Sequence, residues 1–143
     1  MKGKLFSSLI ASAILLAVGT QSASAQLGDD SRPFARWANP DWHYTAPLLS
    51  SSDEDWYYWI NETDSYKFIW ASVQSPAGLN YDIRGFVVTP SGQEYEIHSN
   101  ESGPGGIDSF GIGMNPGDKI YFRIRPDLVD YNPTLNYDFR ISY

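Results

Sequence analysis

Short runs of aromatic and β-branched residues recur along the chain after residue 25, and glycine, proline, asparagine, aspartate or serine ends each run. No window in this part of the sequence has apolar residues at the i, i+3, i+4, i+7 spacing of an amphipathic helix, so we expect no helices there. Runs of this kind are typical of β-strands. We expect strands over residues 43–49, 55–60, 66–73, 81–89, 94–98, 109–113, 119–125 and 136–143. Seven or eight strands separated by turns predict an all-β protein, an antiparallel and jelly-roll-like β-sandwich.

Prolines and turn residues set the organisation of this sandwich. Pro47 restricts its strand to the edge of a sheet, because proline donates no backbone hydrogen bond. Pro90-Ser91-Gly92 is a turn signal, so the strands on either side of it are expected to pair as a hairpin. Two prolines interrupt residues 26–42, which we expect to be irregular, and residues 43–143 are expected to form a single domain.

The first residues have the pattern of an export signal. Two lysines precede an apolar run over residues 5–19, and the small-residue site Ala23-Ser24-Ala25 follows it. This order predicts a secretory signal peptide over residues 1–25, cleaved before Gln26. The alternative, a membrane anchor, is disfavoured because the run is shorter than the roughly 20 residues that span a bilayer. We therefore expect a secreted, extracellular protein with no membrane contact after cleavage.

Charge and cysteine content narrow the class of protein further. The first 25 residues carry two lysines and no acid, so their removal changes the net charge from −7 to −9. Such a chain repels nucleic acid, whose binding depends on basic side chains that neutralise phosphates. The chain has no cysteine, so apolar packing, with or without a metal ion, must stabilise the domain. An exported domain without cysteine is more typical of bacteria than of animals.

Several stretches, in this order along the chain, resemble one known family. They are Gly28-Asp29-Asp30-Ser31-Arg32-Pro33-Phe34-Ala35, Ser52-Asp53-Glu54-Asp55-Trp56-Tyr57-Tyr58-Trp59, Phe86-Val87-Val88-Thr89-Pro90-Ser91-Gly92, and finally residues 115–124 with residues 137–141. Together they resemble the bacterial pre-peptidase C-terminal domain over about residues 28–143. Arg84-Gly85 stand where that family usually has Asp-Leu. The resemblance implies a β-sandwich related to the collagen-binding domains of collagenases, with a non-catalytic, extracellular role.

Catalytic residues are scarce in this sequence. His43 and His98 are the only histidines, and no Gly-x-Ser-x-Gly elbow accompanies them. Thiol chemistry is excluded because there is no cysteine. Gly103-Pro104-Gly105-Gly106 lacks the Lys-Ser/Thr that follows the glycines of a phosphate-binding loop. We therefore expect a protein that is not an enzyme, and a small hydrolase is the least favoured function.

Acidic residues in two segments are candidate metal ligands. Asp29, Asp30, Asp53 and Asp55 offer the hard oxygen atoms that calcium prefers. The resemblance implies the same, since related collagen-binding domains bind calcium through acids of the N-terminal segment and a neighbouring loop. The alternative is that these are solvated turn residues whose carboxylates accept local backbone hydrogen bonds.

Aromatic residues are more numerous than one small core needs. After cleavage, 21 of them remain in 118 residues. On the strand over residues 55–60, strand alternation together with the family pattern directs Tyr57 and Trp59 inward and Trp56 and Tyr58 outward. The expected ligand-binding residues are Trp56, Tyr58, Tyr121 and Arg123. The alternative is that the aromatic N-terminal segment covers them through Phe34, Trp37, Trp42 and Tyr44.

These features favour a secreted, non-catalytic binding module, expected to be a monomer. It would contact an extracellular polysaccharide or protein through an aromatic sheet face, and calcium would order its N-terminal segment. An inhibitor or accessory factor of a secreted hydrolase is the alternative.

Overall fold

The computed structural model describes residues 29–143, so the predicted signal peptide lies outside the described residues. A short 3-10 helix, η1 (Arg32–Phe34), precedes the strands. The strands are β1 (Arg36–Trp37), β2 (His43–Pro47), β3 (Asp55–Ile60), β4 (Lys67–Gln74), β5 (Tyr81–Val88), β6 (Glu94–His98), β7 (Ile107–Met114), β8 (Lys119–Pro126) and β9 (Asn136–Ser142). No helix within residues 29–143 has the length and apolar character needed to span a membrane.

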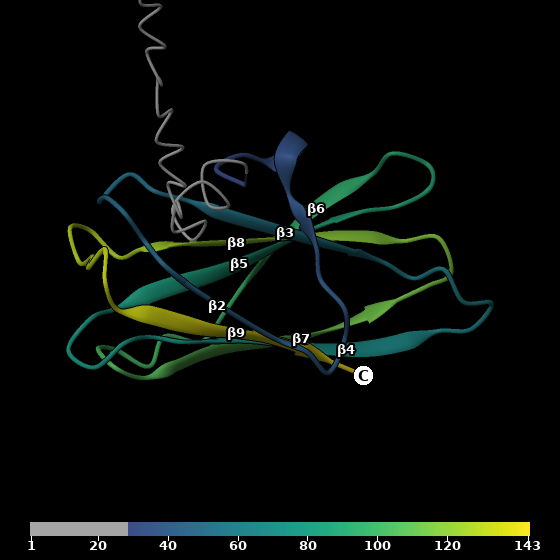
Figure 1. Cartoon of the computed structure of the whole chain (residues 1–143). Coiled ribbons are helices and arrows are strands. Elements are labelled where there is room, and N and C mark those ends of the chain that lie inside the picture. Colours follow the sequence, from purple (N-terminus) through teal and green to yellow (C-terminus); the bar gives the residue numbers. More distant parts are fainter. Residues whose placement is uncertain (1–28) are drawn as a thin grey trace, which may run out of the picture.

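The strands form two stacked sheets, which confirms the predicted β-sandwich. One sheet has the order β1-β3-β8-β5-β6 and the other has the order β2-β9-β4-β7. Figure 1 shows them as an upper and a lower layer, with the dark blue N-terminal segment on the outer side of the upper layer before it descends into β2. All pairs are antiparallel except β1 with β3, which is parallel.

Local sequence signals predicted most of these strands correctly. β2 lies at a sheet edge and pairs only with β9 within the described residues, as Pro47 required. β5 and β6 form the predicted hairpin, in which Val88 pairs with Glu94. β7 is longer than the expected strand over residues 109–113, because it pairs with β4 along its whole length. The prediction missed Ile107, Asp108 and Met114, which lie at the two ends of the strand next to turn residues.

The segment over residues 26–42 is not wholly irregular as expected, because β1 joins the edge of the five-stranded sheet. Arg36 pairs with Tyr57 and Trp37 pairs with Tyr58. A strand of two residues has no detectable alternation, and its parallel partner lies about 20 residues further along the chain. This short pairing fixes the N-terminal segment along the edge of the sheet, beside β3.

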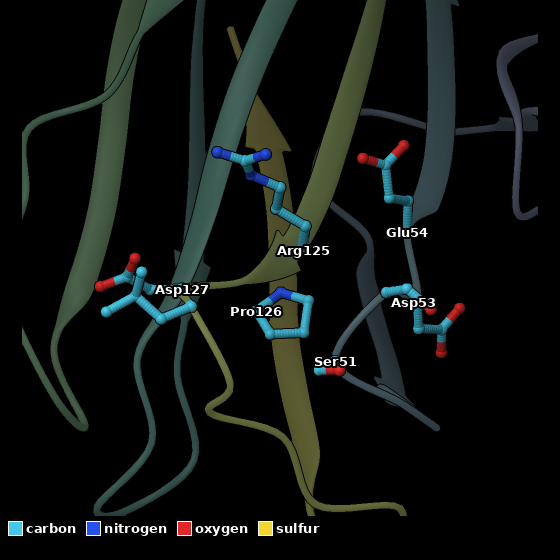
Figure 2. Close-up of a pocket in the computed structure, with 8 residues that line it drawn as sticks. Ser51, Asp53, Glu54, Arg125, Pro126 and Asp127 are labelled. Atoms are coloured by element: carbon cyan, nitrogen blue, oxygen red, sulfur yellow. The ribbon is translucent and has the colours of Figure 1, made fainter.

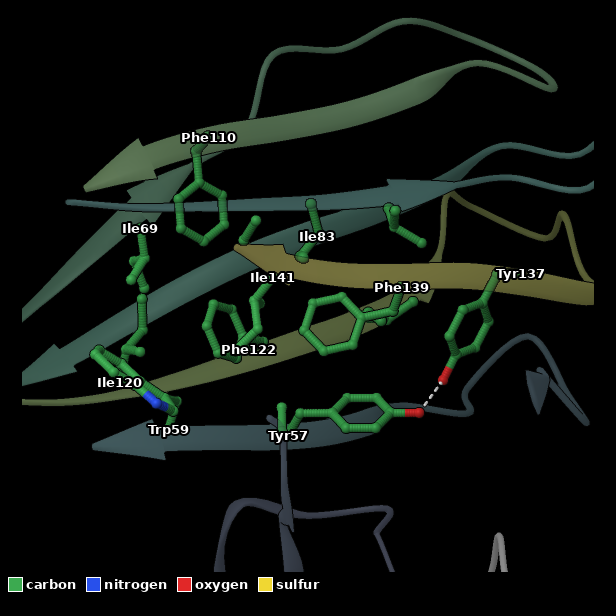
Figure 3. Packing of buried hydrophobic residues seen from close by; sticks show 14 of the residues in the cluster. Tyr57, Trp59, Ile69, Ile83, Phe110, Ile120, Phe122, Tyr137, Phe139 and Ile141 are labelled. Carbon is green, nitrogen blue, oxygen red and sulfur yellow. Dashed lines mark hydrogen bonds between the residues drawn. The ribbon is translucent and has the colours of Figure 1, made fainter. Parts of the chain in front are cut away.

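The core lies between the sheets and is filled by every second residue of the central strands. On β8, Ile120, Phe122 and Ile124 are fully buried, as the alternation predicts. The rings of Tyr57 and Phe139, from opposite sheets, pack with centroids 4.7 Å apart (Figure 3). The largest fully buried side chains are Tyr57, Tyr81, Tyr137, Phe122, Phe139, Leu48, Ile69, Ile83, Met114, Ile120, Ile124 and Ile141. Burial of each aliphatic or phenylalanine side chain stabilises the fold by about 1.5–3 kcal/mol.

Candidate functional site

The outer face of the five-stranded sheet, expected to bind a ligand, is covered by the protein's own N-terminal segment. Trp56 points outward but is only 7% exposed. The guanidinium carbon of Arg32 lies 4.8 Å from the ring centroid of Phe86, 4.9 Å from that of Tyr121 and 5.5 Å from that of Trp56. Two Arg32 nitrogens also donate to the carboxylate of Glu94, each at 2.9 Å. The expectation that Trp56 is open to solvent is therefore wrong.

Neighbouring side chains cover the rest of this face. The ring of Trp37 packs edge-on against Tyr58, with centroids 5.3 Å apart. The Nζ atom of Lys119 lies 4.6 Å from the Tyr58 ring centroid. Arg123 forms an ion pair with Glu54, with 3.6 Å between Nη1 and Oε1. Trp37 thus covers this face as the alternative reading expected, but the main cover over Trp56 is Arg32.

The other aromatic residues of the N-terminal segment do not help to cover this face. Phe34 and Trp42 are exposed to solvent. Tyr44, on β2 of the four-stranded sheet, packs instead against Phe139 of the same sheet and against Tyr57 of the five-stranded sheet.

An exposed aromatic surface lies on the opposite sheet instead. Tyr66, Phe68 and Trp70, here called the aromatic row, are 60%, 54% and 50% exposed. Phe68 and Trp70 alternate along β4 with the buried Ile69 and Ala71, so they share the outer face of the four-stranded sheet. The alternation was visible in the sequence, but nothing there showed that this face, unlike that of β3, is left uncovered.

Glycines on β7 let these rings lie close against the sheet. Gly113 pairs with Phe68 and Gly111 pairs with Trp70. A Cβ atom at Gly111 would lie 2.6 Å from Cζ of Phe68 and 2.8 Å from Cε3 of Trp70. A Cβ atom at Gly113 would overlap the ring of Tyr66. The rings of the aromatic row therefore lie directly over the backbone of Gly111 and Gly113, where no side chain separates them from the sheet.

A second candidate site is a carboxylate cluster beneath the N-terminal segment. Oxygen atoms of Asp29, Asp30 and Asp55 lie within 4.8 Å of one another. Three of the four predicted metal ligands therefore come together. Asp53 is not in the cluster, and its Oδ2 accepts a hydrogen bond of 2.6 Å from the backbone N–H of Leu49.

Burial dominates the electrostatics of this cluster. Burial raises the pKa of Asp29 to about 6, although the ion pair with Arg36 opposes that shift. Burial likewise raises the pKa of Asp55 to about 7, although a hydrogen bond from Tyr137 opposes it. Among the described residues, the Oδ1 atoms of both carboxylates are buried and accept no hydrogen bond. Burying such acceptors is unfavourable unless a cation or proton compensates them.

The network extends from this cluster into the core. The Tyr137 hydroxyl donates to Oδ2 of Asp55. It also lies 2.8 Å from the Tyr57 hydroxyl, a contact drawn as a dashed line in Figure 3. Burial raises the pKa of Tyr57, so both hydroxyls stay protonated at neutral pH. The cluster is thus fixed to the centre of the sandwich as well as to the N-terminal segment.

A polar pocket of about 400 Å³ opens between the turn before β3 and the end of β8. Figure 2 shows Asp53 and Glu54 on one side of it and Asp127 on the other, with Arg125 between them. Among residues 29–143, no aromatic side chain lines it. Its lining is mostly charged and polar, and only Pro126 and Leu128 are apolar, so it lacks the largely apolar lining that holds a small ligand tightly.

The two histidines do not form a common site. His43, on β2, lies 3.3 Å from Asp138. His98, on β6, lies 3.5 Å from Glu96. β2 and β6 belong to different sheets.

Several solved structures are similar to this chain, among them a domain of a collagenase. No protein-family model matches the sequence, and no curated protein matches it. The crystal structure of the pre-peptidase C-terminal domain of a collagenase from Bacillus anthracis is similar, with a TM-score of 0.53 and 16% sequence identity. The match covers 76% of this chain and 94% of that chain. The chain has the fold of a pre-peptidase C-terminal domain.

The pre-peptidase C-terminal fold agrees with the resemblance that the sequence motifs indicated. At 16% identity the likeness establishes the architecture alone. The role of the aromatic row and of the carboxylate cluster therefore depends on the side chains of this chain.

Proposed function

We propose that this protein is an extracellular, non-catalytic binding module. Its aromatic row would bind a polymer, which is either a polysaccharide or a protein. The observation that carries the proposal is the half-exposed run of Tyr66, Phe68 and Trp70 on one sheet face. Contiguous exposed aromatic surface is uncommon on soluble monomers and marks interaction sites. Aromatic rings supply a large contact area and lose little side-chain entropy on binding.

The flatness of the site supports a polymer rather than a small molecule as the ligand. The rings lie over Gly111 and Gly113 on an open sheet, and β4 extends over eight residues. Such a surface contacts several units of an extended chain at once, and the contributions of the separate contacts add. A small ligand needs an enclosing pocket to bury most of its surface.

We further propose that Asp29, Asp30 and Asp55 bind calcium. The donor set fits this ion, because all donors are carboxylate oxygens and two buried oxygen atoms lack hydrogen-bond donors among the described residues. A bound divalent cation would supply positive charge that compensates the repulsion among the carboxylates. It would join the N-terminal segment, through Asp29 and Asp30, to the first residue of β3.

A co-sedimentation assay tests the proposed binding function. The purified protein is mixed with insoluble cellulose, chitin, peptidoglycan and collagen, and the bound fraction is measured. Saturable binding to one of them is expected, with an affinity lower by about fivefold or more for Trp70→Ala, since an aromatic contact contributes about 1–3 kcal/mol. Phe34→Ala is the matched control, because Phe34 is also exposed but lies on the N-terminal segment.

Two results would count against this function. Absence of binding to every polymer would overturn it, and so would equal losses in the Trp70 and Phe34 variants. Capture of a specific secreted hydrolase, with its activity changed, would favour the inhibitor or accessory factor instead.

Calcium binding is tested separately by isothermal titration of chelator-treated protein with CaCl₂. Asp30→Asn should weaken binding at least tenfold, because the exposed Asp30 contributes one charged ligand and little to the fold. Asp64→Asn, at another exposed acid, should leave binding unchanged. Titration without binding heat, together with an unchanged melting temperature in calcium, would exclude the site.

A further inference from the structure

A pocket of about 310 Å³ opens at the end of the aromatic row, on the outer face of the four-stranded sheet. The indole rings of Trp42 and Trp70 line it together with His43, Ser72 and Arg140. Trp42 lies just before β2 and Trp70 lies on β4, and β9 separates these two strands in the sheet. Trp42 is 63% exposed, and neither tryptophan is needed to fill the core.

The strand register divides this sheet face into an aromatic half and a polar half. His43, Arg140 and Ser72 lie side by side across β2, β9 and β4. Ser142 stands beside Trp70 in the adjacent row, where the aromatic half begins. The pocket therefore lies at the boundary, where a ligand meets apolar ring faces and hydrogen-bonding groups at the same time.

The polar groups at this boundary are held in place by an ion-pair network. Nε and Nη2 of Arg140 donate to the carboxylate of Asp138 at 3.0 and 2.7 Å. Nδ1 of His43 lies 3.3 Å from the same carboxylate. These contacts use only part of the donor capacity of a guanidinium, which carries five N–H groups. The remaining donors belong to a side chain that is half exposed and already oriented.

We propose that this pocket binds one sugar ring of a neutral polysaccharide whose chain continues along the aromatic row. The inference rests on the proposed binding function and names its ligand class. The C–H groups on the face of a pyranose ring carry partial positive charge and pack on the negative faces of Trp42 and Trp70. Its hydroxyl groups both donate and accept, which suits the neighbouring arginine, histidine and serine side chains.

Charge and geometry favour a neutral sugar chain over other polymers. Asp41, which also lines the pocket, and the acidic net charge disfavour an anionic chain, whereas Arg140 disfavours a cationic one. The site is on the face of the sheet, whereas the backbone groups that could pair with a further strand point sideways at its edges, β2 and β7. An extended peptide therefore cannot add to it as a further strand through backbone hydrogen bonds.

The test is titration of the purified protein with cellohexaose, chitohexaose and mannohexaose, followed by tryptophan fluorescence and calorimetry. At least one of these should bind, and Trp42→Ala should weaken that binding at least tenfold. Arg140→Gln, which removes the charge from an exposed side chain, should weaken it about tenfold, as expected for loss of a charge-assisted hydrogen bond. Phe34→Ala should bind like the wild-type protein. Circular dichroism verifies that each variant is folded.

The outcomes separate this inference from the function on which it rests. Binding to collagen that depends on Trp70, with no response to any of the three sugars, would overturn the saccharide ligand and leave the binding function intact. Sugar binding unchanged in both Trp42→Ala and Arg140→Gln would overturn the pocket. Loss of all polymer binding would overturn both.

Discussion

Replacement of Asp55 by asparagine tests the reasoning about the carboxylate cluster most directly. Asp55 is fully buried, and one of its oxygens accepts the hydrogen bond from Tyr137. Burial, with smaller contributions from the acids Asp29 and Asp53, raises its pKa to about 7, although the Tyr137 hydrogen bond and Arg36 oppose that rise. In metal-free protein at neutral pH, ionisation of Asp55 therefore opposes folding, and the neutral amide removes that ionisation while it keeps an acceptor for the tyrosine.

The sign of the pH dependence follows from the difference in pKa between the two states. Between the ordinary value of 3.8 and about 7, folded Asp55 keeps a proton that the unfolded chain has lost. The free energy of unfolding of the metal-free protein should therefore fall as pH rises through this interval. One pKa unit corresponds to about 1.4 kcal/mol, so the loss from Asp55 is on the order of 4 kcal/mol. Asp29, whose pKa is raised to about 6, acts in the same direction.

The assay is urea unfolding followed by tryptophan fluorescence, at pH 5 and pH 7.5, with chelator or with calcium. In chelator, the wild-type protein should be less stable at pH 7.5 than at pH 5, and Asp55→Asn should show a much smaller difference. Calcium should stabilise the wild-type protein at pH 7.5, by about 2.7 kcal/mol when its concentration is a hundredfold above the dissociation constant. Asp55→Asn should lose most of that effect.

A metal-free wild-type protein whose stability rises from pH 5 to pH 7.5 would refute this account. The same conclusion would follow if Asp55→Asn were destabilised equally at both pH values, because Asp55 would then act only as a hydrogen-bond acceptor. The pH range stops at 5 because two other ion pairs are lost in stronger acid. Arg32 lowers the pKa of Glu94, and Arg140 lowers the pKa of Asp138, so both carboxylates stabilise the folded protein only while they are ionised.

Three further substitutions test the fold and the position of the binding face. Gly111→Ala should weaken polymer binding severalfold in the co-sedimentation assay, because the new Cβ atom would displace the Phe68 ring. The free energy of unfolding should change by no more than about 1 kcal/mol. Trp56→Ala should lower the free energy of unfolding in urea by about 3 kcal/mol, with polymer binding by the folded fraction unchanged, because Trp56 is covered. Gly85→Ala should lower the melting temperature, since its Cβ atom would lie 2.7 Å from Cζ of the buried Phe110, and overpacking of this kind destabilises by about 1–3 kcal/mol.

The carboxylate cluster could be predicted in part from the sequence. The family resemblance pointed to Asp29, Asp30 and Asp55, and the structure brings their oxygens together. It also pointed to Asp53, which lies outside the cluster and accepts a hydrogen bond within its own turn. Sequence proximity could not separate Asp53 from Asp55, because adjacent backbone conformations decide which carboxylate points toward the N-terminal segment.

The strands themselves were determined by local sequence. Alternation along residues 119–125 predicted correctly which side of β8 enters the core, and Pro47 predicted an edge strand. These features depend on the period of two in an extended chain and on the missing donor of proline, both of which act within a few residues. The sequence therefore determined the fold class, most of the strand positions and the inward face of each central strand, but not the two-residue strand β1.

Only the tertiary structure decided which outer face is open. Trp56 on β3 and Trp70 on β4 both point away from the core, and their local sequences are similarly aromatic. Arg32 covers the first by pairing with Glu94, 62 residues away in sequence, whereas nothing among the described residues covers the second. Alternation assigns each side chain to a face, but contacts between distant segments determine whether that face meets solvent, and local sequence does not encode them.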